Sequence, residues 1–213
     1  MDWLVKNWEL VIGLSWVHMG LSIFPIIGGL VISLPLGWVA FRYRGVGRFI
    51  VPASGLLYTI PSLPLFIALP VVLGTSILDS ANLVMGLTIY AIALLVRQIV
   101  DALGSVSQDV RQASVAMGYS PWQRFWRVDL PLAGPVLLSG LRVVAVSTVS
   151  LVSIGSVIGV TSLGYLFLNG FKRGIPAEVL TGVLATVIIA FLFDGTLVLI
   201  GRYVMPWTRK VTS

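Results

Sequence analysis

The chain has 213 residues, of which only 10% are charged, whereas a soluble domain carries roughly 25% charged residues. Apolar residue types make up 57% of the chain, and its mean hydropathy is +1.00. This composition excludes an ordinary cytosolic enzyme, a disordered protein and a nucleic-acid-binding domain. The net charge of +6 suits a membrane surface, because the charges lie between apolar runs. The absence of cysteine excludes disulfide scaffolds, Cys-ligated metal sites and thiol catalysis.

Long uncharged stretches predict an all-α integral membrane protein with five transmembrane helices, because a helical span needs about 20 apolar residues. Residues 1–17 carry three tryptophans between charged residues, which predicts a short external segment at the membrane interface. Residues 18–204 then form one transmembrane domain, and residues 205–213 form a tail. We place the spans at about residues 18–41, 49–73, 80–97, 139–160 and 179–202.

The basic residues predict how the spans are oriented. With an external N-terminus, the inner side receives all but three of the 14 lysines and arginines; only Lys6, Lys172 and Arg173 stay outside. Positive residues favour the cytoplasmic side. We therefore expect a multi-pass membrane protein with its N-terminus outside and its C-terminus in the cytoplasm.

The second span contains Pro52, Pro61, Pro64 and Pro70, each of which removes a backbone donor and tends to kink a helix. Such breaks are tolerated where neighbouring protein or a water-lined path satisfies the freed carbonyl groups. The second span is therefore predicted to be distorted rather than a plain lipid-facing cylinder.

Small residues recur in two other spans, where they permit close helix contact. Gly155 and Gly159 form a GxxxG pattern in the fourth span, and Gly29, Ser33 and Gly37 repeat this spacing in the first. Packing within the bundle is one interpretation, and a translocation pathway or a subunit interface is the other. The candidate pathway or interface residues are Pro61, Ser62, Ser147, Ser150, Gly155 and Gly159.

Asp194 is the one acidic residue inside a predicted span, and an intramembrane ionisable group is a functional candidate. It lies about two turns from Arg202, with Arg142 at a similar level. A structural ion pair, a gating role and proton coupling are its three interpretations. His18 is the only histidine, so a histidine-rich metal cluster is excluded. We expect His18 to be an interfacial polar residue at the start of the first span.

Residues 101–135 form the longest polar stretch and lie on the predicted cytoplasmic side. Ser105 or Ser107 can cap a first helix, which Gly118 can end in the left-handed conformation. Ser120 can cap a second helix with Pro121 at its first position, and Leu130-Pro131 is expected to stop it. The pair could lie flat on the inner leaflet or insert into a groove on a soluble partner. The helix–glycine–helix order favours the partner.

This stretch resembles the EAA loop of ABC-importer permeases. That motif reads Glu-Ala-Ala, three residues, Gly, nine residues and then Ile-x-Leu-Pro. The chain has Gln112–Gly118, then nine residues, then Val128–Pro131 at the same spacing. It departs from the motif at Gln112, Ser114 and Val128.

The resemblance extends over nearly the whole chain to the small permeases of osmoprotectant importers, which carry glycine betaine, choline, carnitine or proline. It implies a second, identical or similar permease, two ATPase subunits and an external substrate-binding protein, with the loop as the coupling helix that contacts the ATPase. The further segments that carry it are Trp16–Phe41, Thr59–Leu63, Leu95–Arg97 and Gly155–Gly164. The implied coupling residues are Gln112, Ala113, Ser114, Gly118, Tyr119, Trp122, Leu130 and Pro131.

No GxxxxGK[ST] motif occurs in the sequence, so this chain cannot hold ATP phosphates by a P-loop. ATP and magnesium are expected on the separate ATPase, and we predict no cofactor, metal site or catalytic residue here. Aromatic residues can cage a quaternary ammonium group, but the resemblance implies that this selection lies in the external binding protein. Lys172 and Arg173 belong either to a solvated loop or to a docking site for an acidic patch of that protein.

The resemblance therefore leads to the prediction of a permease subunit of a bacterial ATP-driven ABC importer for compatible solutes, located in the bacterial cell membrane, and not an enzyme. An ABC importer for another small solute, such as methionine or another amino acid, is the alternative within the class. An ion-driven secondary transporter and a membrane scaffold without transport are the alternatives outside it. Secondary carriers usually show internal repeats and midplane charges, and we find neither here.

Overall fold

A computed structural model describes residues 2–76 and 78–211, and no β-strand occurs in this part of the chain. Its helices are joined by short connections. In chain order they are α1 (Asp2–Lys6), α2 (Trp8–Arg42), α3 (Arg44–Thr59), α4 (Ser62–Leu73), α5 (Ser80–Gly104), α6 (Gln108–Ala116), α7 (Pro121–Arg124), the π-helical η1 (Phe125–Asp129), α8 (Leu130–Val152), the 3₁₀ segment η2 (Ser153–Ile158), α9 (Gly164–Arg173), α10 (Pro176–Val204) and the 3₁₀ segment η3 (Pro206–Val211).

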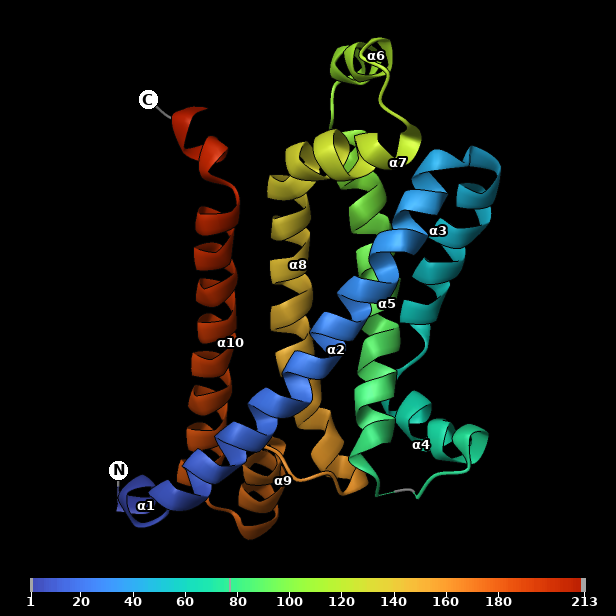
Figure 1. The fold of residues 1–213 in the computed structure, drawn as a ribbon. Coiled ribbons are helices and arrows are strands. Elements are labelled where there is room, and N and C mark those ends of the chain that lie inside the picture. The colour runs from blue at the N-terminus through green and yellow to red at the C-terminus, as the bar shows by residue number, and fades with distance from the viewer. Residues whose placement is uncertain (1, 77, 212–213) are drawn as a thin grey trace.

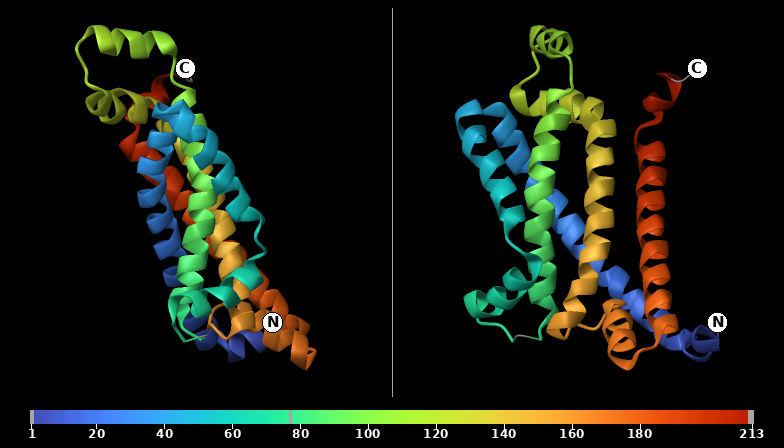
Figure 2. Two further views of the ribbon diagram at one scale, coloured as in Figure 1. Left: turned by 90° about the vertical axis from the view of Figure 1, so that its right-hand side faces the viewer. Right: turned by 180° about the vertical axis from the view of Figure 1, so that it is seen from behind.

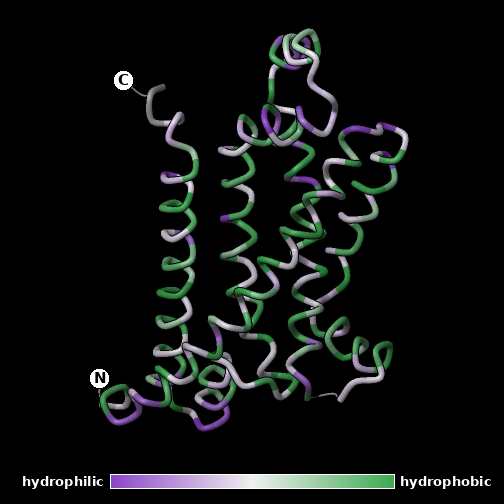
Figure 3. The backbone as a smooth tube through the Cα atoms, viewed as in Figure 1, coloured by the Kyte–Doolittle hydropathy of each residue, from purple (hydrophilic) through white to green (hydrophobic). Residues whose placement is uncertain are grey.

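The long helices run alternately between the two ends of the bundle (Figures 1 and 2). Among the described residues, four helical segments are long and apolar enough to cross a membrane, and the bent pair α3–α4 supplies a fifth. The two termini lie at opposite ends, and α6 and α7 share the end of the C-terminus (Figure 1). Hydrophilic residues gather mainly at these two ends (Figure 3). The all-α membrane fold is thus confirmed; residues 212 and 213 of the predicted tail lie outside the described residues.

Helix α2 is longer than the predicted first span, because it begins at Trp8. Its 35 residues extend about 52 Å at 1.5 Å per residue, against about 30 Å for the hydrocarbon layer. No helix-breaking residue separates residues 8–17 from the span. The external segment expected at residues 1–17 is therefore largely the first part of this helix.

The predicted second span is two helices, α3 and α4, bent by 103°. The break falls at Ile60 and Pro61, where proline supplies no backbone donor. Pro52 and Pro70 instead lie inside α3 and α4. Helix α4 turns away from α3 and lies near one end of the bundle (Figure 1).

Small residues bring α2 against α5. A Cβ atom on Gly29 would lie 2.4 Å from the Cβ of Ala91, and one on Gly37 would lie 2.6 Å from Cγ2 of Ile99. The interpretation of this stripe as packing within the bundle is confirmed. His18 is also part of the interior: it is fully buried, and its Nε2 lies 2.9 Å from the carbonyl oxygen of Val149. The expectation of an interfacial histidine was wrong, because this bond holds the ring between α2 and α8.

The Gly155–Gly159 pattern does not form a helix–helix contact surface. Gly155 lies in η2, where an added Cβ would come 2.5 Å from Cδ2 of Leu83, and Gly159 ends this segment with φ of +88°. The pattern therefore builds a tight turn packed on α5. Its small residues are needed for close approach and for positive φ.

Candidate functional site

The predicted helical pair projects from one end of the bundle as α6 and α7 (Figure 1). Ser107, rather than Ser105, caps α6, with its Oγ 3.5 Å from the backbone nitrogen of Val110. Gly118 adopts φ of +83°, as predicted for the residue between the helices. Ser120 caps α7 through a capping box: its Oγ accepts from the backbone N–H of Gln123 at 3.3 Å, and Gln123 Oε1 accepts from the N–H of Ser120 at 3.0 Å.

The expectation that Leu130-Pro131 stops the second helix was wrong. The helix continues from α7 through the π-helical segment η1 into α8, and the direction changes within this continuous path (Figure 1). Pro131 lies in the first turn of α8, where its missing donor costs little because the widened π turn precedes it. The α6–α7 loop is therefore joined to α8 by helix rather than by a flexible connection.

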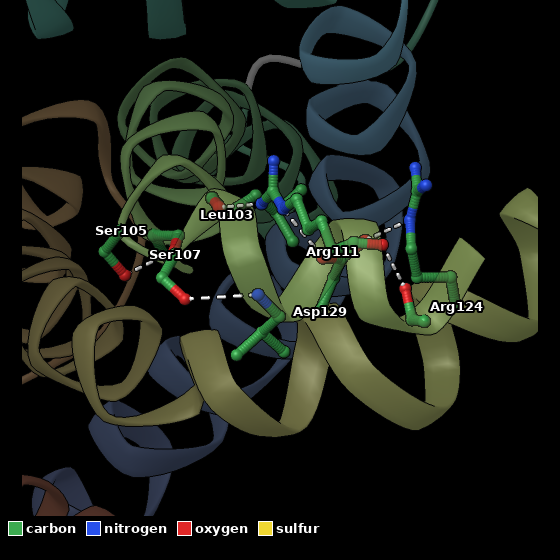
Figure 4. A network of polar contacts seen from close by, with 9 residues as sticks. Leu103, Ser105, Ser107, Arg111, Arg124 and Asp129 are labelled. Carbon is green, nitrogen blue, oxygen red and sulfur yellow. Dashed lines mark hydrogen bonds and ion pairs between the residues drawn. The ribbon is translucent and has the colours of Figure 1, made fainter. Parts of the chain in front are cut away.

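A buried ion-pair network attaches α6 to the bundle (Figure 4). The side chain of Asp129 is 5% exposed; Arg111 Nε lies 3.0 Å from its Oδ1 and Arg124 Nε lies 3.3 Å from its Oδ2. Arg111 also donates through Nη2 to the carbonyl oxygen of Leu103 at the end of α5. One carboxylate thus connects α6, α7 and η1.

The guanidinium of Arg111 also reaches α2. Its Cζ lies 4.4 Å from the centroid of the Phe41 ring, a distance within the range of a cation–π contact. Since the same side chain bonds to Leu103 and Asp129, it contacts the ends of α2, α5 and η1. Arg111 therefore fixes α6 to three elements of the bundle.

Aromatic packing fixes α7 in a similar way. Trp38 of α2 packs against Trp122 and Phe125, each with a ring-centroid distance of 5.6 Å, and Trp126 lies 5.6 Å from Trp122. Phe125 is buried, whereas Trp122 remains 57% exposed. The aromatic side of the second helix is thus shared between the bundle and an open surface.

The predicted coupling residues divide into an exposed and a covered group. Gln112, Ala113, Gly118 and Trp122 are exposed. Ser114 is 1% exposed, and its Oγ donates to the carbonyl oxygen of Arg111 at 2.7 Å. The half-buried members of the set are Tyr119, Leu130 and Pro131. The exposed group offers a contact surface, while the covered group shapes the loop.

Exposed apolar side chains extend this surface along α6. Val115 is 56% exposed and Met117 is 69% exposed. Between α6 and the bundle lies an open cavity of about 890 Å³, lined by Phe41, Arg44, Gly104, Ser105, Val106, Ser107, Gln108, Arg111, Gln112, Val115, Ala116 and Arg124. The loop therefore presents an apolar rim beside a cationic recess.

Sequence reasoning did not predict the ion pairs of Asp129 with Arg111 and Arg124, which we call the Asp129 anchor. Arg111 and Asp129 are 18 positions apart, and Arg111 was treated only as one of the charges on the inner side. The position of Asp129 among Arg124 and Arg127 in an otherwise apolar stretch is the one signal that could have indicated it, since a charge that becomes buried needs a partner.

The pathway candidates are only partly brought together. Pro61 and Ser62 line a cavity of about 230 Å³ at the α3–α4 break, together with Tyr58, Thr59, Ile60, Tyr90 and Leu151. Ser147 is half-buried and Ser150 is exposed on α8, but neither lines this cavity. Gly155 and Gly159 lie in the turn after α8.

Asp194 forms an ion pair with Arg142, one of its two expected partners. Arg142 Nε donates to Oδ1 at 2.6 Å and Nη2 donates to Oδ2 at 2.7 Å. The bidentate geometry links α10 to α8 and is the strongest form of this interaction. Outside this pair α10 is largely exposed, with such side chains as Leu184 and Phe191 open on its surface.

Comparisons with known proteins agree over most of the chain. Residues 29–210 match the family described as binding-protein-dependent transport system inner membrane component. The osmoprotectant import permease protein OsmW of Salmonella typhimurium is 28% identical over 202 residues, covering 92% of this chain and 93% of its own. The glycine betaine/carnitine/choline transport system permease protein OpuCD of Bacillus subtilis is 25% identical over 194 residues, covering 91% and 83%.

Solved structures show the same fold. A chain of the MetNI methionine ABC transporter in an inward-facing conformation superposes with a TM-score of 0.81 and 24% identity, over 93% of this chain and 98% of that chain. At this identity the likeness concerns the fold alone.

Proposed function

The chain belongs to the family of binding-protein-dependent transport system inner membrane components, and on this premise we propose that it carries a compatible solute. As a member of this family it is a permease subunit of an ABC importer in the inner membrane, and it works with ATPase and substrate-binding subunits. Glycine betaine, choline, carnitine and proline are the proposed solutes.

The choice of solute is supported by the relatives. Proteins named for osmoprotectant and for glycine betaine, carnitine and choline transport align with more than 80% of their own length. The methionine transporter shares 24% identity, which supports the fold but not its substrate. Compatible solutes are therefore favoured over methionine or another amino acid.

The geometry that carries the mechanism is the Arg111–Asp129 anchor. ATP and magnesium bind to the partner ATPase, whose movement displaces the exposed surface of α6 and α7. Because Arg111 contacts the ends of α2 and α5, and η1 continues into α8, this displacement reaches three spans. Two permeases and two ATPases would complete the importer, with substrate passing between the permeases.

The orientation follows from the same proposal. An ATPase on the cytoplasmic side requires α6 there, and the C-terminus lies at the same end of the bundle (Figure 2). The N-terminus and α9, with Lys172 and Arg173 in its last turn, then face the external binding protein.

Uptake by the assembled importer tests the function. The permease, its ATPase and its binding protein are placed in vesicles, and uptake of glycine betaine, choline, carnitine and proline is measured with and without internal ATP, with methionine as the control solute. We expect ATP-dependent uptake of at least one compatible solute and none of methionine. Uptake of methionine alone, or uptake that persists without ATP and follows an ion gradient, would refute the proposal.

A further inference from the structure

The end of α3 leaves backbone acceptors without partners inside the protein. Helix α3 ends at Thr59, and Pro61 has no N–H to continue it. The carbonyl oxygen of Ile60 accepts from the Tyr90 hydroxyl. No hydrogen bond from the described residues reaches the carbonyl oxygens of Tyr58 and Thr59. Since the C-terminal end of a helix carries about half a negative charge, this end attracts a cation.

The break lies near the middle of the membrane-crossing part of the bundle. Tyr90, which bonds to it, is the eleventh of the 25 residues of α5. It therefore lies about 15 Å along that helix from its first residue, close to half of a hydrocarbon layer about 30 Å thick. Free carbonyl groups at this depth are tolerated only against protein or a water-filled cavity, which argues against lipid on this face.

Two tyrosine rings border the same cavity. Tyr58 and Tyr90 pack edge to face, with centroids 5.5 Å apart and planes at 75°. Tyr90 is held by Phe66, at a centroid distance of 6.3 Å, and by its bond to Ile60. Tyr58 is 44% exposed, so part of its ring remains open. An aromatic face attracts a cation, and quaternary ammonium groups are bound in this way.

We propose that the cavity at the α3–α4 break is a transient binding site in the permease for the quaternary ammonium group of the solute, with the Tyr58 ring and the carbonyl oxygens of Tyr58 and Thr59 as its ligands. The inference rests on the proposed function and adds a residue-level contact within the translocation path. No acidic side chain lines the cavity, so the cation is held by rings and dipoles, which allows its release.

The size and surroundings of the cavity fit a small solute in transit. Its volume of about 230 Å³ is below the range of about 300–1,000 Å³ that is typical of pockets for drug-sized ligands. Leu151 of α8 lines it, and the exposed Ser150 is its neighbour in sequence. The cavity thus lies between α3, α5 and α8, of which α8 is continuous with the α6–α7 loop.

Graded changes of the Tyr58 ring test the proposal in the assembled importer. Tyr58→Phe keeps the ring and should retain uptake of choline at saturating binding protein. Tyr58→Leu should lower it about 2- to 30-fold, the range that corresponds to typical cation–π energies. Phenylalanines with one, two and three ring fluorines at position 58 should lower uptake progressively, because fluorine weakens the ring's attraction for a cation at nearly constant shape.

The controls separate this contact from a structural role. Tyr165→Leu, at a position with a similar exposed fraction of 42%, should leave choline uptake unchanged. ATP hydrolysis and the amount of assembled complex should be the same for all Tyr58 variants. Choline uptake by the wild type combined with no dependence on fluorination would overturn the inference and leave the proposed function intact. No uptake of any quaternary ammonium solute by the wild type would reject the inference, and the proposed function would fall with it if proline were not taken up either.

Discussion

The anchor at Asp129 gives the sharpest test of coupling. In Asp129→Asn the charge that faces Arg111 and Arg124 is removed, although the side chain keeps its size and one acceptor oxygen. Both arginine side chains are 19% exposed, so water can replace the lost partner only in part. The predicted consequence is that α6 leaves its position on the ends of α2 and α5 for more of the time.

The size of this effect follows from the burial of the pair. Removal of one partner from a fully buried ion pair costs about 3–5 kcal/mol. Partial access of water to the arginines and the remaining amide acceptor reduce this to about 2 kcal/mol, which corresponds to about a 30-fold shift between the docked and undocked loop. The spans themselves should remain folded, because their packing does not involve this carboxylate.

Two measurements on the assembled importer check the prediction. Hydrogen exchange of the backbone amides in residues 108–116 should become about 30-fold faster, since exchange reports local opening. The number of solute molecules imported per ATP hydrolysed should fall, with ATP hydrolysis itself continuing.

The matched control is Asp109→Asn, which changes an exposed acid in the first turn of the same helix and should alter neither measurement. If Asp129→Asn imports as many solute molecules per ATP as the wild type and exchanges at the same rate, the anchor does not transmit the movement.

Three further predictions concern the loop, the ion pair and the topology. Gly118→Val should uncouple import from ATP hydrolysis, because φ of +83° is penalised by about 1–2 kcal/mol in a residue with Cβ. The control is Gly104→Val, since Gly104 has no positive φ and equally open surroundings. Normal coupling in Gly118→Val would contradict the assignment of this loop as the coupling element. Asp194→Asn should lower the amount of folded complex more than the turnover per complex, because Arg142 loses its bidentate partner. The control Asp101→Asn, at an exposed pair with Arg97, should lower neither. Uptake that collapses with the proton gradient would instead indicate proton coupling. Cysteines at Ser80 and Ser120 should be labelled by impermeant reagents from opposite sides of the membrane, and labelling from one side would reject the five-span topology.

Local sequence signals predicted the helix caps and the turn of the α6–α7 loop well, because each signal depends on a few adjacent residues. The capping serine and proline at Ser120 and Pro121 and the positive φ of Gly118 were found from the sequence. The end of the second helix was not, because Leu130-Pro131 is compatible both with a stop and with the first turn of a new helix. Only the path of the chain through η1 distinguishes the two.

Long-range features were beyond sequence reasoning for a different reason. Four prolines predicted a distorted second span, but not that Pro61 alone would break it, because Pro52 and Pro70 are accommodated within helices. The partner of His18 lies 131 positions away, and the partner of Asp129 in α6 lies 18 positions away. Such contacts depend on how the helices are arranged in space, which no local pattern encodes.

Helix α5 connects the coupling loop with the break in the second span. Its last turn offers the Leu103 carbonyl oxygen to Arg111, and its middle holds Ile60 through the Tyr90 hydroxyl. These two residues are 13 positions apart, which is about 20 Å along a helix. Helix α5 contains no proline, and it packs closely on α2 through Gly29 and Gly37, which favours movement of α5 as one stiff element. We therefore expect a shift of α6 that moves the Leu103 end of α5 to reach Tyr90 as well, and the cavity at the α3–α4 break to change shape with the position of the loop.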